Sequence, residues 1–281
     1  MNNLQKVMLN SLKEFIRVCE KHKLKYYLIG GTALGAIRHG GFIPWDDDLD
    51  VGMPRPDFEK LLKLKDELKK PYFLQHYTTD PSYTYGFMKL RNSNTTYIET
   101  TLVQHNINHG VWIDIFPIDG MSKKNNATKV KGIKPHLLWF AFYFTFLGHF
   151  WKKPRLKTLW RDIPGYIVSI LFIPLNIGNW LTRLIHRCMK KISYSEATLV
   201  GSYHTWSFNK EALPKDFYGD GKKVKFEDVE AIVPSNYDAY LTAKYGNYLQ
   251  LPPENKREGH HKNYGFSLTV GYKDYIFKDK R

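Results

Sequence analysis

Apolar residues recur at helical spacing near the start of the chain and predict an amphipathic helix over residues 3–23. The short apolar run at residues 26–29 stops at a glycine pair, which indicates a buried strand that ends in a tight turn. Thr32 follows this pair and suits the N-cap of one or two helical turns over residues 33–38. The pattern therefore predicts helix, strand, turn and helix in that order.

Short strands and helices alternate in the rest of the pattern. A helix is predicted over residues 58–68, with Asp57 as its cap. This mixture favours an α+β fold, a mixed sheet flanked by helices, with residues 1–123 as the core and residues 192–281 completing it. The other predicted elements are strands over residues 49–53, 85–90, 95–100 and 111–118 and a helix over residues 235–245.

The segment between these parts, residues 124–191, combines basic clusters with apolar runs. From Lys123 to Lys191 the chain has 14 basic residues and one acidic residue, so this stretch carries +13 of the formal net charge of +15. Residues 137–151 and 163–182 have no formal charge. The first run is shorter than the ~20 apolar residues that span a bilayer, and proline and glycine interrupt the second.

A membrane-associating insertion that does not cross the bilayer fits this pattern. All three basic flanks favour the cytoplasmic side, and either one or two spans would place a flank outside. We therefore expect a helical insertion that lies on or in the inner leaflet. The alternative is a helical subdomain buried by ordinary packing. A nucleic-acid-binding enzyme more often has its positive charge spread around the site. Because the positive charge here is concentrated in the apolar segment, we do not expect a nucleic-acid partner.

Cysteine content and the first residues bear on the compartment. The two cysteines, Cys19 and Cys188, form no CxxC pair, which argues against a disulfide framework and a thiolate zinc site. The first residues lack the apolar core of a signal peptide. We expect a cytoplasmic protein that is peripheral on the inner face of the cell membrane.

Four carboxylates fall within five residues, at Asp46, Asp47, Asp48 and Asp50. On one strand, Asp48 and Asp50 would point to the same face about 6–7 Å apart, which suits a divalent cation with oxygen ligands. Asp114 lies within a second apolar strand, where a buried carboxylate needs a cation, a proton or hydrogen bonds. These acids predict a metal site for phosphoryl transfer.

The glycine turn ahead of the short helix suits phosphate binding. Gly30, Gly31 and the amides from Thr32 onward can offer N–H donors at a helix N-terminus. A glycine pair alone is weak support for such a site. The acids that follow it in the sequence strengthen the interpretation.

The run GGTALGAIRHGGFIPWDDDLDVGM at residues 30–53 resembles the signature of the LicD family of phosphotransferases, which are related to the fukutin-related proteins. The similarity covers residues 24–120 and 230–261, and residues 124–191 contain no motif of the family. The other matching motifs are MKLR at 88–91, GVWIDIFPID at 110–119, YGNY at 245–248, LPP at 251–253, and Arg257, His260 and His261.

The resemblance implies a nucleotidyltransferase-like fold and transfer of a phospho-alcohol, in bacterial members typically phosphocholine, from a CDP-activated donor to a sugar hydroxyl, with release of CMP. It implies a Mg²⁺ or Mn²⁺ ion held by Asp48, Asp50 and Asp114, and Asp114 is the favoured base for the acceptor's proton. The residues implied to contact donor phosphates are Gly30, Gly31, Thr32, Arg38, His39, Lys89, Arg257 and His260.

The implied acceptor is a cell-surface glycan of the teichoic acid or lipopolysaccharide type, or its lipid-linked precursor. A lipid-linked acceptor would explain an insertion that holds the enzyme at the inner leaflet. CDP-choline is the favoured donor, while ribitol and glycerol phosphate stay open because the many aromatic residues single out no choline cage.

Two other functions compete with this interpretation. One is a nucleotidyltransferase that releases pyrophosphate, and the acids alone do not separate the two reactions. The other is a non-enzymatic basic protein that binds membranes or nucleic acid, which leaves the acids unexplained.

We expect Asp→Asn at Asp48, Asp50 or Asp114 to nearly abolish transfer while stability holds or rises, because like-charge repulsion is relieved.

Overall fold

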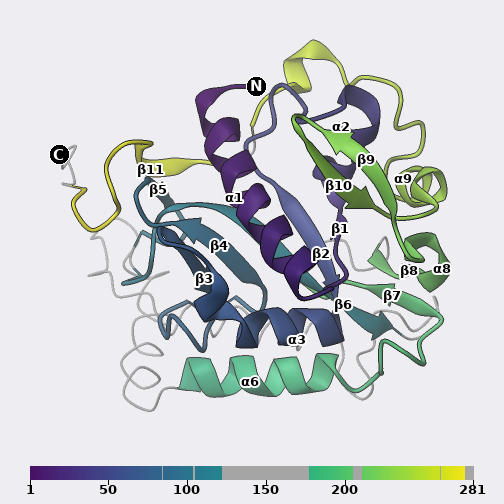
Figure 1. The fold of residues 1–281 in the computed structure, drawn as a ribbon, viewed down its shortest axis with the longest axis horizontal. Helices are drawn as coiled ribbons and strands as arrows, with labels where there is room; N and C mark the ends of the chain where they lie inside the picture. The colour runs from purple at the N-terminus through teal and green to yellow at the C-terminus, as the bar shows by residue number, and fades with distance from the viewer. Residues whose placement is uncertain (84, 104, 122–176, 205–210, 260, 276–281) are drawn as a thin grey trace, which may run out of the picture.

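The computed structural model describes residues 1–83, 85–103, 105–121, 177–204, 211–259 and 261–275. A mixed seven-stranded sheet forms its centre (Figure 1). Strands β7 (Leu199–Gly201) and β8 (Leu213–Pro214) extend this sheet from the end of β6. The remaining strands lie in the order β1 (Tyr27–Leu28), β2 (Asp50–Pro54), β6 (Val111–Met121), β4 (Met88–Asn92) and β3 (Tyr72–Gln75).

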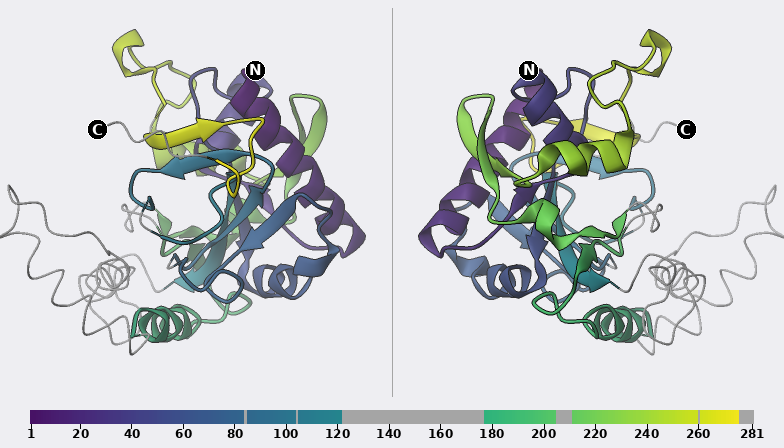
Figure 2. Two further views of the ribbon diagram at one scale, coloured as in Figure 1. Left: turned by 90° about the vertical axis from the view of Figure 1, so that its left-hand side faces the viewer. Right: turned by 90° about the vertical axis from the view of Figure 1, so that its right-hand side faces the viewer.

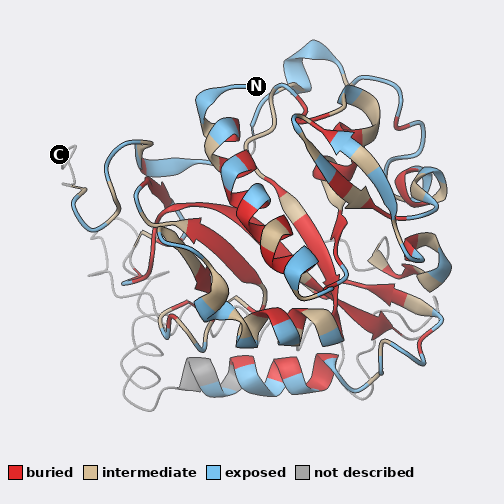
Figure 3. Ribbon diagram, in the orientation of Figure 1, coloured by how far each residue is buried: buried red, intermediate tan, exposed pale blue. Residues whose placement is uncertain are grey.

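The central strand β6 is parallel to β2 and antiparallel to β4 and β7. Ten of its 11 residues are buried, and Figure 3 shows β2, β4 and β6 as the most continuously buried part of the sheet. Because both faces of β6 are covered, its sequence is a nearly continuous apolar run rather than an alternating one. A charged residue on such a strand therefore needs a specific partner.

Helix α1 (Asn3–Lys21) lies across one face of the sheet and packs on β4 and β6 (Figure 1). Its start is a capping box, in which Asn2 Oδ1 accepts from the Gln5 amide and Gln5 Oε1 accepts from the Asn2 amide, each at 2.9 Å. Gln5 Nε2 also donates to the carbonyls of Ile43 and Asp46. The first helix therefore fixes the loop that leads into β2.

The other helices lie at the borders of the sheet. Helix α2 (Gly30–His39) contacts β1, β2 and α9 (Tyr237–Tyr245). Helix α3 (Arg55–Lys63) follows β2 and is extended by a short 3-10 helix, η1 (Lys65–Glu67). Helix α6 (Ile177–Met189) lies beside α3 in Figures 1 and 2. The remaining helices are α8 (Lys215–Tyr218) and the 3-10 helix η4 (Glu254–Lys256).

Two small antiparallel sheets complete the described structure. Strands β9 (Lys222–Phe226) and β10 (Val229–Val233) form a hairpin near α2. Strand β11 (Asn263–Ser267) pairs with β5 (Thr96–Glu99). This second pairing brings the C-terminal strand onto the side of the molecule where β3 and β4 lie (Figure 1).

The predicted mixed sheet with flanking helices is confirmed, and several predicted boundaries are wrong. Helix α2 begins at Gly30, so Thr32 lies inside its first turn and is not the N-cap. Helix α3 begins at Arg55, because Pro56 can occupy its first turn, so Asp57 does not cap it. Strand β2 begins at Asp50, so Asp48 precedes the strand and does not share its face with Asp50.

The predicted insertion, residues 124–191, lies outside the described residues up to residue 176. Its helical, membrane-associating character stays a prediction, as does the proposed division of the chain at residues 123 and 191. In the part of the chain that the structure describes, no helix is both long and apolar enough to cross a membrane.

Candidate active site

Three charged residues lie in line across the centre of the sheet. Asp50 on β2 is the register partner of Asp114 on β6, and Asp114 is the partner of Lys89 on β4. Paired positions on neighbouring strands are about 4.7–4.9 Å apart and direct their side chains to the same face. The sheet register therefore brings together three residues that are widely separated in the sequence.

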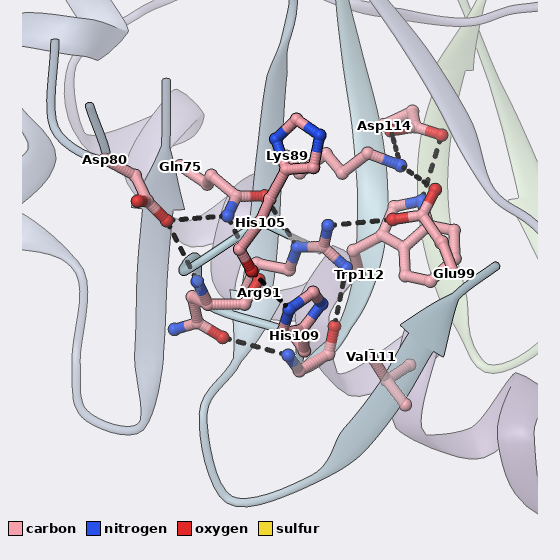
Figure 4. A network of polar contacts seen from close by, with 12 residues as sticks. Gln75, Asp80, Lys89, Arg91, Glu99, His105, His109, Val111, Trp112 and Asp114 are labelled. Carbon is pink, nitrogen blue, oxygen red and sulfur yellow. Dashed lines mark hydrogen bonds and ion pairs between the residues drawn. The ribbon is translucent and has the colours of Figure 1, made fainter. Parts of the chain in front are cut away.

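Asp114 has the partners that its burial requires (Figure 4). Trp112 Nε1 donates to its Oδ2 at 3.0 Å, and Lys89 Nζ lies 3.1 Å from its Oδ1. The Lys89 ammonium also sits 4.0 Å from the centre of the Trp112 ring. Because Lys89 is almost fully buried in these contacts, the structure places it as a partner of Asp114 rather than as an open phosphate ligand.

The contacts of Lys89 continue into a buried ionic network on β4 and β5 (Figure 4). Glu99 accepts from Lys89 at 3.1 Å and from Arg91 Nη2 at 2.9 Å. Arg91 also donates to Gln75 Oε1 at 2.8 Å and to the Gly110 carbonyl at 2.9 Å. Burial opposes ionisation of Glu99, but the two cations outweigh it and lower the pKa of Glu99 to about 2.

The carboxylates of the loop before β2 have the opposite electrostatics. Burial and the neighbouring Asp48 raise the pKa of Asp46 to about 8. Burial also raises the pKa of Asp48, although His261 opposes this change. Burial, Asp48 and Asp114 raise the pKa of Asp50 well above its usual range. These three residues keep partial solvent exposure, so a charged ligand can reach them.

The start of α2 lies beside these carboxylates. We call residues 46–50, which contain Asp46, Asp47, Asp48 and Asp50, the acid loop. The Asp50 amide donates to Thr32 Oγ1 at 2.8 Å, and the Gly30 amide donates to Tyr240 Oη at 3.0 Å. A Cβ added to Gly30 would lie 3.4 Å from Asp50 Oδ2, and one added to Gly31 would lie 3.2 Å from Asp46 Oδ2. Glycine therefore allows the carboxylates to approach the helix N-terminus, whose amides favour negative charge.

A C-terminal loop covers the other side of the acid loop. The His261 amide donates to Asp47 Oδ2 at 2.9 Å, and His261 Nδ1 lies 3.1 Å from Asp47 Oδ1 and 3.9 Å from Asp48 Oδ2. A Cβ on Gly259 would lie 2.5 Å from Asp47 Oδ2. His261 also packs edge-on to Trp112. His260, one of the predicted phosphate-binding residues, lies outside the described residues.

The remaining predicted phosphate-binding residues gather at the opposite end of α2. Arg38 and His39 lie about 12 Å along the helix axis from Gly30. Arg38 Nη1 donates to the carbonyls of Tyr248 and Gln250. Arg257 lies 5.5 Å from the centre of the Trp45 ring, and the His39 ring packs edge-on to the same tryptophan.

These residues form a second, basic group that the structure does not bring onto the start of α2. Burial and the nearby Arg257 lower the pKa of Arg38, as expected where two guanidinium groups lie close together. The loop that contains Trp45 and Asp46 connects this group to the acid loop. A phosphate-bearing donor would have to extend along α2 to contact both groups.

The carboxylates match Mg²⁺ or Mn²⁺ in the chemistry of their donor atoms. Hard divalent cations prefer oxygen ligands, and Asp46, Asp48, Asp50 and Asp114 supply only oxygen. Asp114 Oδ1 accepts no hydrogen bond, although Lys89 is close to it. Within the described ranges, however, no three His, Cys, Asp or Glu side chains converge closely enough to hold a metal ion. The donor chemistry fits, and a finished ligand cage is not present.

The sequence did not identify several residues of this site. Asp46 and Asp47 were counted in the acidic cluster but were given no role, and Glu99 and Tyr240 come from elements with no motif of their own. His261 was matched to the family pattern without a role. One available signal was the helical spacing of Tyr237, Tyr240 and Tyr245, which places tyrosines along one side of α9.

A separate cavity of about 400 Å³ lies at the other end of β2. Pro54, Asp57, Tyr194, Lys215 and Asp220 are among the residues that line it. Since Asp50 begins β2 and Pro54 ends it, this cavity does not contain the acids. It gives no support to a second binding site near the predicted catalytic residues.

Clustered carboxylates beside a glycine-initiated helix are typical of enzymes that handle phosphate groups. Residues 23–156 match the family described as LicD/FKTN/FKRP, nucleotidyltransferase domain. The chain therefore carries a LicD-family domain, and the resemblance predicted from the motifs is confirmed. Homology within this family supports a phosphotransferase that acts in phospho-alcohol transfer.

Individual relatives agree with this assignment. The chain is 28% identical over 259 residues to the lipopolysaccharide cholinephosphotransferase LicD of Haemophilus influenzae, which covers 92% of this chain and 94% of that protein. It is 47% identical over 49 residues to the ribitol 5-phosphate transferase FKRP of Homo sapiens, which covers 16% of this chain and 10% of that protein. An uncharacterized protein of Rickettsia typhi, RT0683, is 43% identical over 54 residues.

Proposed function

We propose that the protein transfers a phospho-alcohol, with phosphocholine favoured, from a CDP-activated donor to a sugar hydroxyl and releases CMP. One observation carries the proposal. Asp46, Asp48 and Asp50, whose pKa values are raised by burial and by neighbouring carboxylates, lie beside Asp114 and the N-terminus of α2, within the LicD-family domain. Full-length similarity to a cholinephosphotransferase supports choline over ribitol, because the match to the ribitol 5-phosphate transferase is confined to 49 residues.

The acid loop is proposed to serve a divalent cation, with Asp48, Asp50 and Asp114 as its ligands. When bound, such a cation would neutralise charge on the donor phosphates and on the CMP leaving group. The backbone amides at the start of α2 would donate hydrogen bonds to the partly neutralised phosphates. Phosphoryl transfer depends mainly on positioning and charge neutralisation, and these groups supply both.

Asp114 is the proposed base for the acceptor hydroxyl. Trp112 and Lys89 fix its carboxylate in one orientation, at 3.0 and 3.1 Å. A carboxylate held in place can take a proton from a hydroxyl at hydrogen-bond distance. Arg38, His39 and Arg257 are proposed to bind donor phosphate oxygens or the acceptor from the far end of α2.

The proposed acceptor is a cell-surface glycan or its lipid-linked precursor, and the proposed location is the inner face of the cell membrane. The lipopolysaccharide substrate in the name of the Haemophilus influenzae relative supports a glycan acceptor. The basic, apolar stretch between residues 123 and 191 supports a membrane surface as partner. A nucleotidyltransferase that releases pyrophosphate is the competing proposal.

The test incubates the full chain with MgCl₂ and CDP-choline, CDP-ribitol or CDP-glycerol and quantifies CMP by chromatography. Pyrophosphate is measured in parallel with CTP as substrate. Release of CMP from one CDP-alcohol, without pyrophosphate from CTP, is the expected result. Pyrophosphate release without CMP would establish the competing reaction.

Two variants make this assay specific. Asp50→Asn should abolish CMP release, because it removes a carboxylate of the proposed site. Asp66→Asn is the matched control, since Asp66 is 86% exposed and is paired with the neighbouring, exposed Lys65. Equal CMP release by both variants would exclude the acid loop from the reaction.

A further inference from the structure

One face of helix α6 is fixed against the body of the protein. Thr182, Ile185 and His186 are buried, with exposed fractions of 0%, 4% and 2%. The His186 ring packs against Tyr77 at 5.0 Å and His204 at 5.6 Å between ring centres. These contacts set the rotation of the helix about its axis, so the direction of the opposite face is set as well.

The opposite face of α6 carries large apolar side chains among basic ones. Trp180 is 60% exposed and Leu184 is 40% exposed, although each is large and apolar. Arg183 and Arg187 are exposed beside them, and Lys191 follows the end of the helix on the same side. At 100° per residue, these five positions fall within an arc of about 100°. We call these five residues the α6 outer face.

Among the described residues, no acidic side chain lies close enough to neutralise the α6 outer face. The sequence of α6 contains no Asp or Glu. Among the described residues, no carboxylate lies within 4.0 Å of Arg183, Arg187 or Lys191, whereas the neighbouring Lys190 is paired with Glu59 at 3.1 Å. A surface helix ordinarily exposes mixed charges and buries its apolar residues. This face instead presents apolar side chains together with cations that have no carboxylate partner in the part of the chain that the structure describes.

We propose that the α6 outer face binds the surface of a membrane that contains anionic lipid. Trp favours the membrane–water interface, and a basic face with exposed Trp and Leu is typical of helices that lie in the interface plane. The phosphates of a nucleic acid would satisfy the cations but would leave Leu184 exposed. The sequence adjoining α6 is also strongly basic and apolar, as the +13 charge between Lys123 and Lys191 shows.

This inference rests on the proposed function for its choice of compartment, and it assigns residues to the expected membrane partner. The binding assay does not depend on catalysis, so the two can fail separately. CMP release without vesicle binding would overturn the surface alone, and vesicle binding without CMP release would overturn the activity alone.

The test measures sedimentation of the full chain with vesicles of phosphatidylcholine alone or of phosphatidylcholine and phosphatidylglycerol at 3:1. Binding should require the anionic lipid at 0.15 M salt. The triple variant Arg183→Gln, Arg187→Gln, Lys191→Gln should weaken binding by about 100-fold, at about fivefold per cation. Trp180→Ala with Leu184→Ala should weaken it by about tenfold, because their apolar surface no longer enters the interface.

Matched controls separate this face from general surface charge. Lys222, Lys223 and Lys225 are exposed on β9, so replacing all three by Gln removes the same charge elsewhere. Leu249, at 62% exposure, provides the control for Leu184. The β9 and Leu249 controls should bind vesicles like the parent.

Equal losses in the β9 and α6 charge variants would overturn the assignment, because binding would then follow total charge. A loss in the α6 charge variant for a single-stranded DNA oligomer, with unchanged vesicle binding, would assign the face to nucleic acid instead. Circular dichroism should show the same helix content in every variant, since all the replaced side chains are exposed.

Discussion

Two neighbouring groups of charged residues in this protein have opposite electrostatics. In the network of Lys89, Arg91, Glu99 and Asp114, each carboxylate lies within 3.1 Å of a cation, and the pKa of Glu99 falls to about 2. In the acid loop, the carboxylates repel one another and their pKa values rise, that of Asp46 to about 8. Asp50 and Asp114, one from each group, are register partners on adjacent strands.

The two groups differ in how their carboxylates are compensated. Those of the network are paired with cations inside the fold, whereas those of the acid loop repel one another. The network lies in the interior, where an ion must be paired to be tolerated. The acid loop stays partly exposed, so its repulsion costs less and a cation can enter from solvent. Strongly perturbed carboxylates gathered in one place are a common mark of a functional site.

The largest expected effect comes from breaking the network. Glu99→Gln should lower the free energy of unfolding by about 3–5 kcal/mol, because it leaves Lys89 and Arg91 buried with less compensating charge. Urea denaturation measures the change. Asp66→Asn, at an exposed pair, should change stability by no more than about 0.5 kcal/mol. A loss below about 1 kcal/mol in Glu99→Gln would show that the network is not structural.

Removing a charge from the acid loop should affect activity instead of stability. Asp48→Asn and Asp50→Asn should each lower the rate of CMP release by about 100- to 1000-fold, as expected when one electrostatic contact to a developing charge is lost. Their free energy of unfolding without metal should hold or rise by up to about 1 kcal/mol, because repulsion is relieved. Retention of more than a tenth of the parent rate in Asp50→Asn would contradict this role.

Asp114→Asn should lower stability, unlike Asp48→Asn and Asp50→Asn. From the sequence, we expected the stability of all three variants to hold or rise. The structure gives Asp114 an ion pair with Lys89, so its replacement leaves Lys89 with Glu99 as its remaining partner within 4.0 Å among the described carboxylates. Asp114→Asn should therefore lose both activity and about 1–3 kcal/mol of stability.

Local patterns predicted the strands around these residues because burial on both faces leaves continuous apolar runs in β2 and β6. The motifs likewise identified Asp50, Asp114 and Lys89. Their alignment depends on strand register, which only the folded sheet defines. The family resemblance assigned Lys89 to the donor phosphates, which stays a prediction, and its pairing with Glu99 on β5 has no signal in the sequence of β4.

Contacts between distant segments account for the other errors. Helix α2 begins at Gly30, whose amide donates to Tyr240 more than 200 residues away, so the local choice of Thr32 as N-cap was wrong. His261 reaches Asp47 because β11 pairs with β5, and no local pattern predicts that pairing. Arg38 lies apart from Gly30 because eight residues of helix separate them by about 12 Å along the axis of α2.

A smaller effect on stability concerns three histidines that pack together at α6, namely His76, His186 and His204. Burial lowers the pKa of His76 and of His204 to about 3 and that of His186 well below its usual range. Below pH 6.5 these histidines become protonated in the unfolded chain but stay neutral in the folded protein. The free energy of unfolding therefore falls as pH decreases. His186→Gln should flatten that fall by up to about 1.4 kcal/mol per pH unit between pH 6.5 and 4.5. An unchanged slope in urea denaturation across this range would contradict the burial of a neutral His186.

The smallest effect should come from His261, and its pH dependence should have the opposite sign. The hydrogen bond with Asp47 raises the pKa of His261, against the effect of burial. A raised histidine pKa gives stability that is fully present below about pH 6.5 and is lost as pH rises through the folded pKa. His261→Ala should therefore cost about 0.5–1 kcal/mol at pH 6 and close to nothing at pH 9, because the backbone amide still donates to Asp47. His22→Ala is a control for surface histidines, since its ring lies 3.7 Å from Glu67 on an exposed helix end. A cost for His261→Ala that stays constant from pH 6 to 9 would show that the ring acts by packing on Trp112 and not by its charge on the acid loop.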